Sequence, residues 1–175
     1  MNDELLKELA DKEAIRSVLF RYCRAIDRCD PELLATVYHP DATDDHGAYS
    51  GPASGFIAWY LAHAPRTLKA MQHNLGTIII ALRGDAAVSE AYFTATNLRR
   101  AAGDAPELKD VLVGRYLDRF ERRDGEWRIA RRVVVKDFRD VRPVMDEPEA
   151  YRESRQGRED PLYAMLAELD AGAPA

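Results

Sequence analysis

The chain has 175 residues, of which 46% are hydrophobic and 31% are charged, and its formal net charge is −5. This length fits a single domain that can bury a core of its own, and the composition is ordinary for a folded protein. The acidic balance argues against a general nucleic-acid binder, which would carry a basic excess. No apolar run approaches the roughly 20 residues that span a bilayer. We therefore expect no nucleic-acid partner and no membrane partner.

Cellular location and metal content are constrained by a few residues. The N-terminal residues 1–4 are acidic and lack the basic-then-apolar pattern of a signal peptide, so we expect a cytoplasmic protein. Cys23 and Cys29 lie in one predicted helix at a spacing that fits reduced thiols. The four histidines form no HxH or HExxH motif, although His46 and His73 with a carboxylate have the chemistry to bind a metal. We predict no metal site and no cofactor.

The first half of the chain has the apolar spacing of helices. We predict three helices, at residues 3–29, 31–37 and 52–64. The first is one long amphipathic helix or two helices that break near Asp11. Asp30 and Pro31 provide the N-cap and the first position of the second helix, and Pro65 is expected to end the third. The segment 42–49 is expected to be a short strand or an extended edge.

The second half of the chain is typical of strands separated by turns. We predict four strands, at residues 70–82, 86–99, 109–122 and 126–139. Asp124-Gly125 is a strong hairpin signal, and long strands joined by short loops predict an antiparallel meander. Helices followed by a curved sheet predict an α+β fold in which the helices close one face of the sheet and form a cone with an apolar interior. Such interiors bind small molecules.

The composition becomes charged and helical after Arg142. We predict a helix at residues 147–155, and a second one that begins at Asp160-Pro161 and ends near Leu169. The chain is therefore divided into a domain at residues 1–142 and a helical extension at residues 143–175. The extension is expected to cover the sheet or to pack on a neighbouring subunit.

Several short motifs, taken in their order and spacing, resemble the SnoaL-like branch of the NTF2-like superfamily, whose fold is the cystatin-like α+β cone. The motifs are Arg21-Tyr22-Cys23-Arg24-Ala25-Ile26-Asp27, Tyr38-His39-Pro40-Asp41-Ala42, Asp45-His46-Gly47 with Gly51-Pro52, His73-Asn74-Leu75-Gly76-Thr77, and the run from Gly114 to Ile129. The resemblance covers about residues 8–140. This branch is similar to scytalone dehydratase, lindane dehydrochlorinase, polyketide cyclases and ketosteroid isomerase, and it includes many binding proteins that are not enzymes.

The resemblance implies a catalytic pair. In the dehydratase and dehydrochlorinase type, an aspartate at the end of the first long helix holds a histidine on the first long strand, and Asp27 and His73 occupy these positions. A neutral imidazole accepts a proton near neutral pH, and a carboxylate on its far nitrogen fixes the tautomer and stabilises the cation. The alternative is that His73 only begins a strand and Asp27 only caps a helix end.

Other side chains have weaker claims to the site. In an extended segment only one of Asp45 and His46 faces the cone. We favour His46, which would act as an acid for the leaving group or as a hydrogen-bond donor to the substrate. The alternative is that this segment is a surface turn. Tyr22 and Tyr49 either hold a substrate oxygen or belong to the core. The remaining substrate-binding predictions are aromatic side chains that form pocket wall or plain core, and polar side chains that need a partner within apolar strands. These residues are Trp59, Phe93, Phe138, Asn97 and Arg115.

The function we expect is that of a cofactor-independent lyase or isomerase acting on a small, apolar and aromatic or cyclic molecule. His73 would remove a proton from carbon or a hydroxyl, and the lost fragment would be water, halide or a small carbonyl such as formaldehyde. Two rival interpretations are a ligand-binding protein without activity, and an assembly module similar to the small subunits of ring-hydroxylating dioxygenases. We expect a small-molecule substrate and a homodimer or homotrimer.

Overall fold

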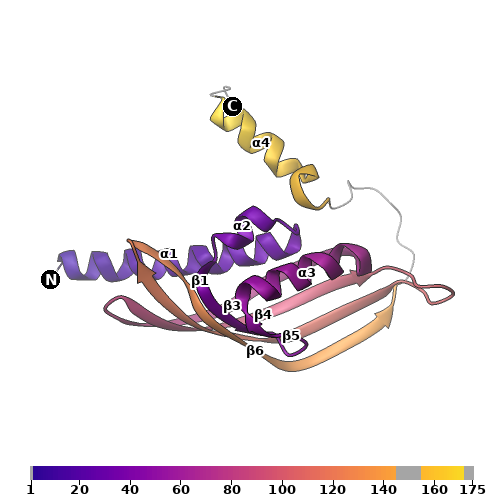
Figure 1. Ribbon diagram of the computed structural model, residues 1–175, viewed down its shortest axis with the longest axis horizontal. Coiled ribbons are helices and arrows are strands. Elements are labelled where there is room, and N and C mark those ends of the chain that lie inside the picture. The colour runs from indigo at the N-terminus through magenta and orange to yellow at the C-terminus, as the bar shows by residue number, and fades with distance from the viewer. Residues whose placement is uncertain (1, 145–154, 172–175) are drawn as a thin grey trace.

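The computed structural model describes residues 2–144 and 155–171. Helices lie on one side of a bent sheet, and the opposite side of the sheet has no helix against it in the described part of the chain (Figure 1). The elements in chain order are α1 Asn2–Asp27, α2 Pro31–Ala35, β1 Tyr38–Asp45, β2 Ser50–Pro52, α3 Ala53–Thr67, β3 Leu68–Arg83, β4 Ala86–Arg99, β5 Leu108–Arg123, β6 Glu126–Pro143, the 3-10 turn η1 Gly157–Glu159, and α4 Pro161–Asp170.

The sheet has six strands in the order β2-β1-β6-β5-β4-β3. Strands β3 to β6 form the predicted antiparallel meander, but β1 pairs with β6 in parallel, so the sheet is mixed rather than purely antiparallel. The chain leaves β2 at one edge, and α3 carries it to the opposite edge, where the meander begins with β3. Strand β3, which bears His73, is therefore an edge strand.

The sheet bends because its long strands contain register shifts, at 75–78 in β3, at 113–114 in β5 and at 119–120 in β5. Gly114 lies at one of these shifts. A Cβ atom at Gly114 would approach the carbonyl oxygen of Val135 to 2.1 Å, so a side chain does not fit there. The curvature lets α1 and α3 lie in the concave face, where the core residues of both helices meet the inner face of the sheet.

Of the two alternatives for the first helix, the structure shows one helix that is unbroken through Asp11. The second helix ends at Ala35, before the predicted residue 37, and the third continues past Pro65 to Thr67. Pro65 lies in the last turn of α3, and as a proline it has no backbone N–H to donate. The N–H of Leu68 still donates to the carbonyl of Ala64 at the end of the helix. The predicted helix at 147–155 lies almost entirely outside the described residues.

The helix starts predicted at Asp30 and Asp160 are confirmed. The Asp30 carboxylate accepts a hydrogen bond from the backbone N–H of Leu33 at 3.0 Å, and the Asp160 carboxylate accepts one from Leu162 at 3.1 Å. Asp160 also reaches the first helix, where it pairs with Arg24 at 3.2 Å. The α4 segment is thus tied to the end of α1, while the division of the chain at residue 142 stays a prediction.

The outer face of the sheet exposes apolar side chains. Ile79, Val88 and Phe138 are each more than half exposed. An apolar surface of this kind suits contact with another protein chain, and the expected homodimer or homotrimer stays a prediction. Within the described residues, no helix has the length and apolar character needed to cross a membrane.

Candidate functional site

Asp27 and His73 are in direct contact, as the resemblance implied. Asp27 is the last residue of α1 and His73 lies on β3, and His73 Nδ1 is 2.6 Å from Asp27 Oδ1. The backbone N–H of His73 donates to the second carboxylate oxygen, Oδ2, at 2.9 Å. Two bonds from one residue to one carboxylate fix the orientation of the imidazole ring. Because Nδ1 donates to the carboxylate, the neutral ring keeps Nε2 unprotonated and able to accept a proton.

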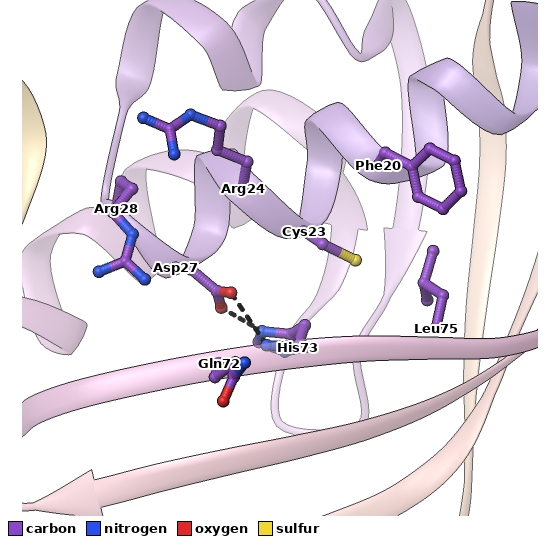
Figure 2. Close-up of a pocket in the computed structure, with 8 residues that line it drawn as sticks. All are labelled: Phe20, Cys23, Arg24, Asp27, Arg28, Gln72, His73 and Leu75. Atoms are coloured by element: carbon purple, nitrogen blue, oxygen red, sulfur yellow. Dashed lines mark hydrogen bonds and ion pairs between the residues drawn. The ribbon is translucent and has the colours of Figure 1, made fainter. Parts of the chain in front are cut away.

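The pair lies in the wall of a pocket of about 310 Å³ between α1 and the edge strand β3. This volume is at the lower end of the range for small-molecule sites. Figure 2 shows Phe20 and Leu75 towards one end of the pocket and Arg24 and Arg28 towards the other, with His73 between them. The site therefore offers an apolar wall and a cationic rim on opposite sides of the proposed base.

Phe93 connects His73 to the buried aromatic interior of the cone. Its ring centroid is 6.4 Å from that of His73, and it stacks on Tyr116 at 4.2 Å. Tyr22 meets Tyr116 edge-on at 5.4 Å. Burial raises the pKa of Tyr22 far above its ordinary value, although Arg132 opposes the effect, so the phenol stays protonated and can donate a hydrogen bond. Phe93 and Tyr22 are thus buried core residues, and they do not line the pocket that contains His73.

Arg132 is a buried residue of this interior that the sequence interpretation missed. Its guanidinium lies between the rings of Tyr22 and Tyr116, 3.9 and 4.1 Å from their centroids, and pairs with both carboxylate oxygens of Asp118 at 2.7 Å. Arg132 and Asp118 are almost completely buried. Among the described residues, Arg132 Nη1 has no hydrogen-bond partner. A buried cation with an unused donor is therefore available beside the aromatic rings.

His46 faces inward and Asp45 faces solvent, in agreement with the prediction. The His46 ring stacks on Phe56 with a centroid distance of 4.3 Å, and its Nε2 is 3.5 Å from the hydroxyl of Tyr22. Its Nδ1 is 2.8 Å from Asp44 Oδ1. The sequence analysis missed Asp44, although strand alternation places residues 44 and 46 on the same side.

Tyr49 and Trp59 belong to an outer aromatic cluster rather than to the His73 pocket. The Tyr49 hydroxyl donates a hydrogen bond to the carbonyl of Pro52 at 2.8 Å, so this hydroxyl has a partner within the protein. Trp59 stacks on Tyr49 at 6.2 Å and is 36% exposed. A role in binding substrate at His73 is not supported for either residue.

Arg115 and Phe138 face away from the cone, which corrects the prediction that they contribute to the pocket. Alternate residues of β5 are buried on the inner face, so Arg115 points outward, where it donates to Glu90 at 2.8 Å. Phe138 lies on the same outer face and is 57% exposed. The sequence did not distinguish the two faces because both carry apolar residues. Asn97 is half-buried opposite Met71, and its role in binding stays a prediction.

The sequence left open a metal site formed by His46 and His73 with a carboxylate. In the part of the chain that the structure describes, no group of three or more His, Cys, Asp or Glu side chains is arranged to hold a metal ion.

A family model described as a SnoaL-like domain matches residues 7–133. The chain belongs to the SnoaL-like family. The matched range of this SnoaL-like domain begins in α1 and ends in β6, and so contains Asp27, His46, His73 and Arg132. No curated protein matches the chain by sequence.

Solved structures of similar fold agree with this assignment. A type 2 hexachlorocyclohexane dehydrochlorinase (LinA) has a TM-score of 0.73 and 14% identity, over 83% of this chain and 99% of that one. A putative scytalone dehydratase from Novosphingobium aromaticivorans has a TM-score of 0.70 and 20% identity, over 87% and 100%. A protein from Kribbella flavida has a TM-score of 0.69 and 21% identity, over 76% and 95%. At these identities the likeness shows the NTF2-like fold.

Proposed function

We propose that this SnoaL-like protein is a cofactor-independent lyase, of the dehydratase or related elimination type, or an isomerase with the same base. The observation that carries the proposal is the 2.6 Å contact between His73 Nδ1 and Asp27 Oδ1 in the wall of a pocket. The names of two similar structures, a dehydrochlorinase and a putative dehydratase, denote eliminations and support the same class of reaction.

The first step of the proposed reaction is proton removal by His73. Its Nε2 takes a proton from a carbon or hydroxyl of the substrate, while Asp27 holds the ring and stabilises the imidazolium that forms. A base positioned in this way contributes about 10²–10⁴-fold to the rate. Binding and orientation in the pocket must supply the remainder.

The second step is departure of the leaving group, and His46 is the proposed proton donor. The Tyr22 hydroxyl is 3.5 Å from His46 Nε2, and Arg132 lies over the face of the Tyr22 ring. A buried guanidinium with an unused N–H stabilises negative charge that develops on a departing oxygen or halide. Water, halide or a small carbonyl would leave by this route.

The proposed substrate is small and apolar, with an aromatic or cyclic framework. The interior between the two histidines is made of aromatic rings, with Phe93 stacked on Tyr116 and Phe56 stacked on His46. Offset and edge-on packing against such rings suits a planar ligand. Phe20 and Leu75 extend the apolar surface to the pocket itself.

The test is a screen of aromatic and cyclic alcohols and halides that have an acidic C–H next to the leaving group. Products are followed by mass spectrometry, and exchange of the C–H in D₂O is followed by NMR. We expect turnover or exchange with the wild-type protein and its loss in His73→Gln.

The matched control for this test is His63→Gln, which changes an exposed histidine of α3 whose Nδ1 lies 2.6 Å from the carbonyl oxygen of Trp59 in the same helix. This variant should keep full activity. Saturable binding of the same compounds with neither turnover nor exchange would instead identify a binding protein, and would contradict the proposed enzyme.

A further inference from the structure

We infer that Asp44 and Tyr38 are positioning residues that hold His46 in the one orientation and tautomer in which Nε2 faces the Tyr22 hydroxyl. This inference rests on the proposed function only in calling His46 a proton donor to the leaving group. The arrangement of the three side chains rests on the geometry of β1 and the residue that follows it.

Asp44 is the centre of this arrangement. It is only 1% exposed, and its two carboxylate oxygens accept from different residues. Tyr38 donates its hydroxyl hydrogen to Oδ2 at 2.6 Å, and His46 Nδ1 lies 2.8 Å from Oδ1. Both bonds are within the range of short, charge-assisted hydrogen bonds. The carboxylate is thus fixed on one side by a buried phenol and on the other by the imidazole.

Burial keeps the Tyr38 phenol in its donating form. Burial raises the pKa of Tyr38 well above its ordinary value, against the opposing effect of Arg132. The hydroxyl therefore keeps its hydrogen near neutral pH and donates it to the Asp44 carboxylate. Asp44 in turn accepts from Nδ1, so a neutral His46 ring carries its hydrogen on Nδ1 and leaves Nε2 bare. The proposed donor is the doubly protonated ring, which keeps its Nδ1 hydrogen on Asp44 and gives the Nε2 hydrogen to the leaving group.

The His46 ring has little freedom to turn. It stacks nearly parallel on Phe56, with an interplanar angle of 18°, and lies 6.4 Å from Tyr116 between ring centroids. With Nδ1 held by Asp44, Nε2 is directed to the Tyr22 hydroxyl at 3.5 Å. This distance is at the long limit of a hydrogen bond, so Nε2 can exchange this partner for a substrate atom.

The charges around the ring match the proposed donor role. Asp44 and Asp118 are buried carboxylates and Arg132 is a buried guanidinium, so these three residues together carry one excess negative charge when ionised. A protonated His46 brings the formal charge of the cluster to zero. At the His73 pocket, Arg24 and Arg28 both pair with Asp160, and Asp27 supplies a second carboxylate, so the formal charges of these four side chains cancel. The excess negative charge thus lies beside His46 and not beside His73.

The test reads the His46 tautomer directly and needs no substrate. Full-length protein labelled with ¹⁵N-histidine is examined by two-bond ¹H–¹⁵N correlation NMR, which distinguishes hydrogen on Nδ1, on Nε2 and on both. His46→Gln assigns the signal. We expect wild-type His46 to carry hydrogen on Nδ1 throughout, and Asp44→Leu to move most of the neutral population to the Nε2–H form.

Two further variants keep the test decisive if Asp44→Leu does not fold. Asp44→Asn retains an acceptor for Nδ1, and we expect it to keep the tautomer but to reduce kcat for a turned-over compound on the order of 10²-fold, with KM unchanged. Tyr38→Phe frees the Asp44 carboxylate and should give a mixture of tautomers. Asp45→Asn, on the exposed neighbour, is the control that should change neither signal nor rate.

The inference would be overturned if wild-type His46 carried its hydrogen on Nε2, or if both Asp44→Leu and Tyr38→Phe left the Nδ1–H signal unchanged. A failed substrate screen would contradict the proposed function and leave the tautomer result standing. The two failures are therefore distinguishable.

Discussion

Replacing Arg132 by methionine should strongly destabilise the fold, because it leaves Asp118 without its partner in the core. Both side chains have no exposed surface, and the two bonds of 2.7 Å between them are lost together. Removing one member of a buried ion pair typically costs about 3–5 kcal/mol. For a chain of this size, each kcal/mol corresponds to roughly 2–4 °C, so we expect the melting temperature to fall by about 6–20 °C.

The pH dependence of this loss follows from the carboxyl group left behind. Burial raises the pKa of Asp118 above its ordinary value even with Arg132 present, and the variant removes the opposing charge. A folded-state pKa above the unfolded one means that the folded protein holds an extra proton. Stability then decreases as pH rises above the unfolded value of about 3.9. The deficit of Arg132→Met should accordingly be smaller at pH 5 than at pH 8.

The assay for this prediction is urea unfolding followed by tryptophan fluorescence at both pH values. Arg131→Met, at the exposed neighbouring position, is the control and should change the free energy of unfolding by less than about 0.5 kcal/mol. Replacing Asp118 by leucine as well should restore most of the loss. A deficit of Arg132→Met below about 1 kcal/mol, or one that grows on acidification, would refute the reasoning.

Two other predictions concern the C-terminal segment and the cysteines. Burial acts to raise the pKa of Asp160, but the hydrogen bond from the Leu162 N–H and the charge of Arg24 outweigh burial and lower the pKa. The stability from these contacts is therefore present at pH values above the ordinary pKa of an aspartate, and it is lost as the pH falls through the lowered pKa of the folded state. Asp160→Asn should therefore speed hydrogen exchange in residues 161–170 without changing that of β4, and unchanged exchange in α4 would contradict the account. Burial raises the pKa of Cys23 to about 12 and of Cys29 to about 11, so both thiols stay protonated at pH 8. Iodoacetamide should label the folded chain more than 10-fold more slowly than the urea-unfolded chain, and equal rates would show that the thiols are accessible.

Local features of the fold followed from the sequence because their causes are local. The caps at Asp30 and Asp160 and the hairpin at Asp124-Gly125 depend on residues a few positions apart. The parallel pairing of β1 with β6 joins segments about 90 positions apart, and no local pattern encodes it. The meander was therefore predictable, while the mixed character of the sheet was not.

The site was predictable only in part, for a related reason. The contact between Asp27 and His73 was predicted from resemblance to a family, because residues 46 positions apart are brought together only by the fold. Arg115 was predicted to bind substrate and Arg132 was not singled out, although each is a charge in an apolar strand. Which face a strand buries depends on the bulges, and the register shift in β5 at 119–120 sets the face on which Arg132 meets Asp118.

The central claim is that His73 removes a proton with Asp27 as its partner. The most direct measurement compares kcat/KM of wild type, His73→Gln and Asp27→Asn on the first compound that the protein turns over, with His63→Gln as control. We predict that both site variants lose at least about 10²-fold while remaining folded, and that the control loses nothing. A His73→Gln protein that keeps the wild-type kcat/KM would contradict the account.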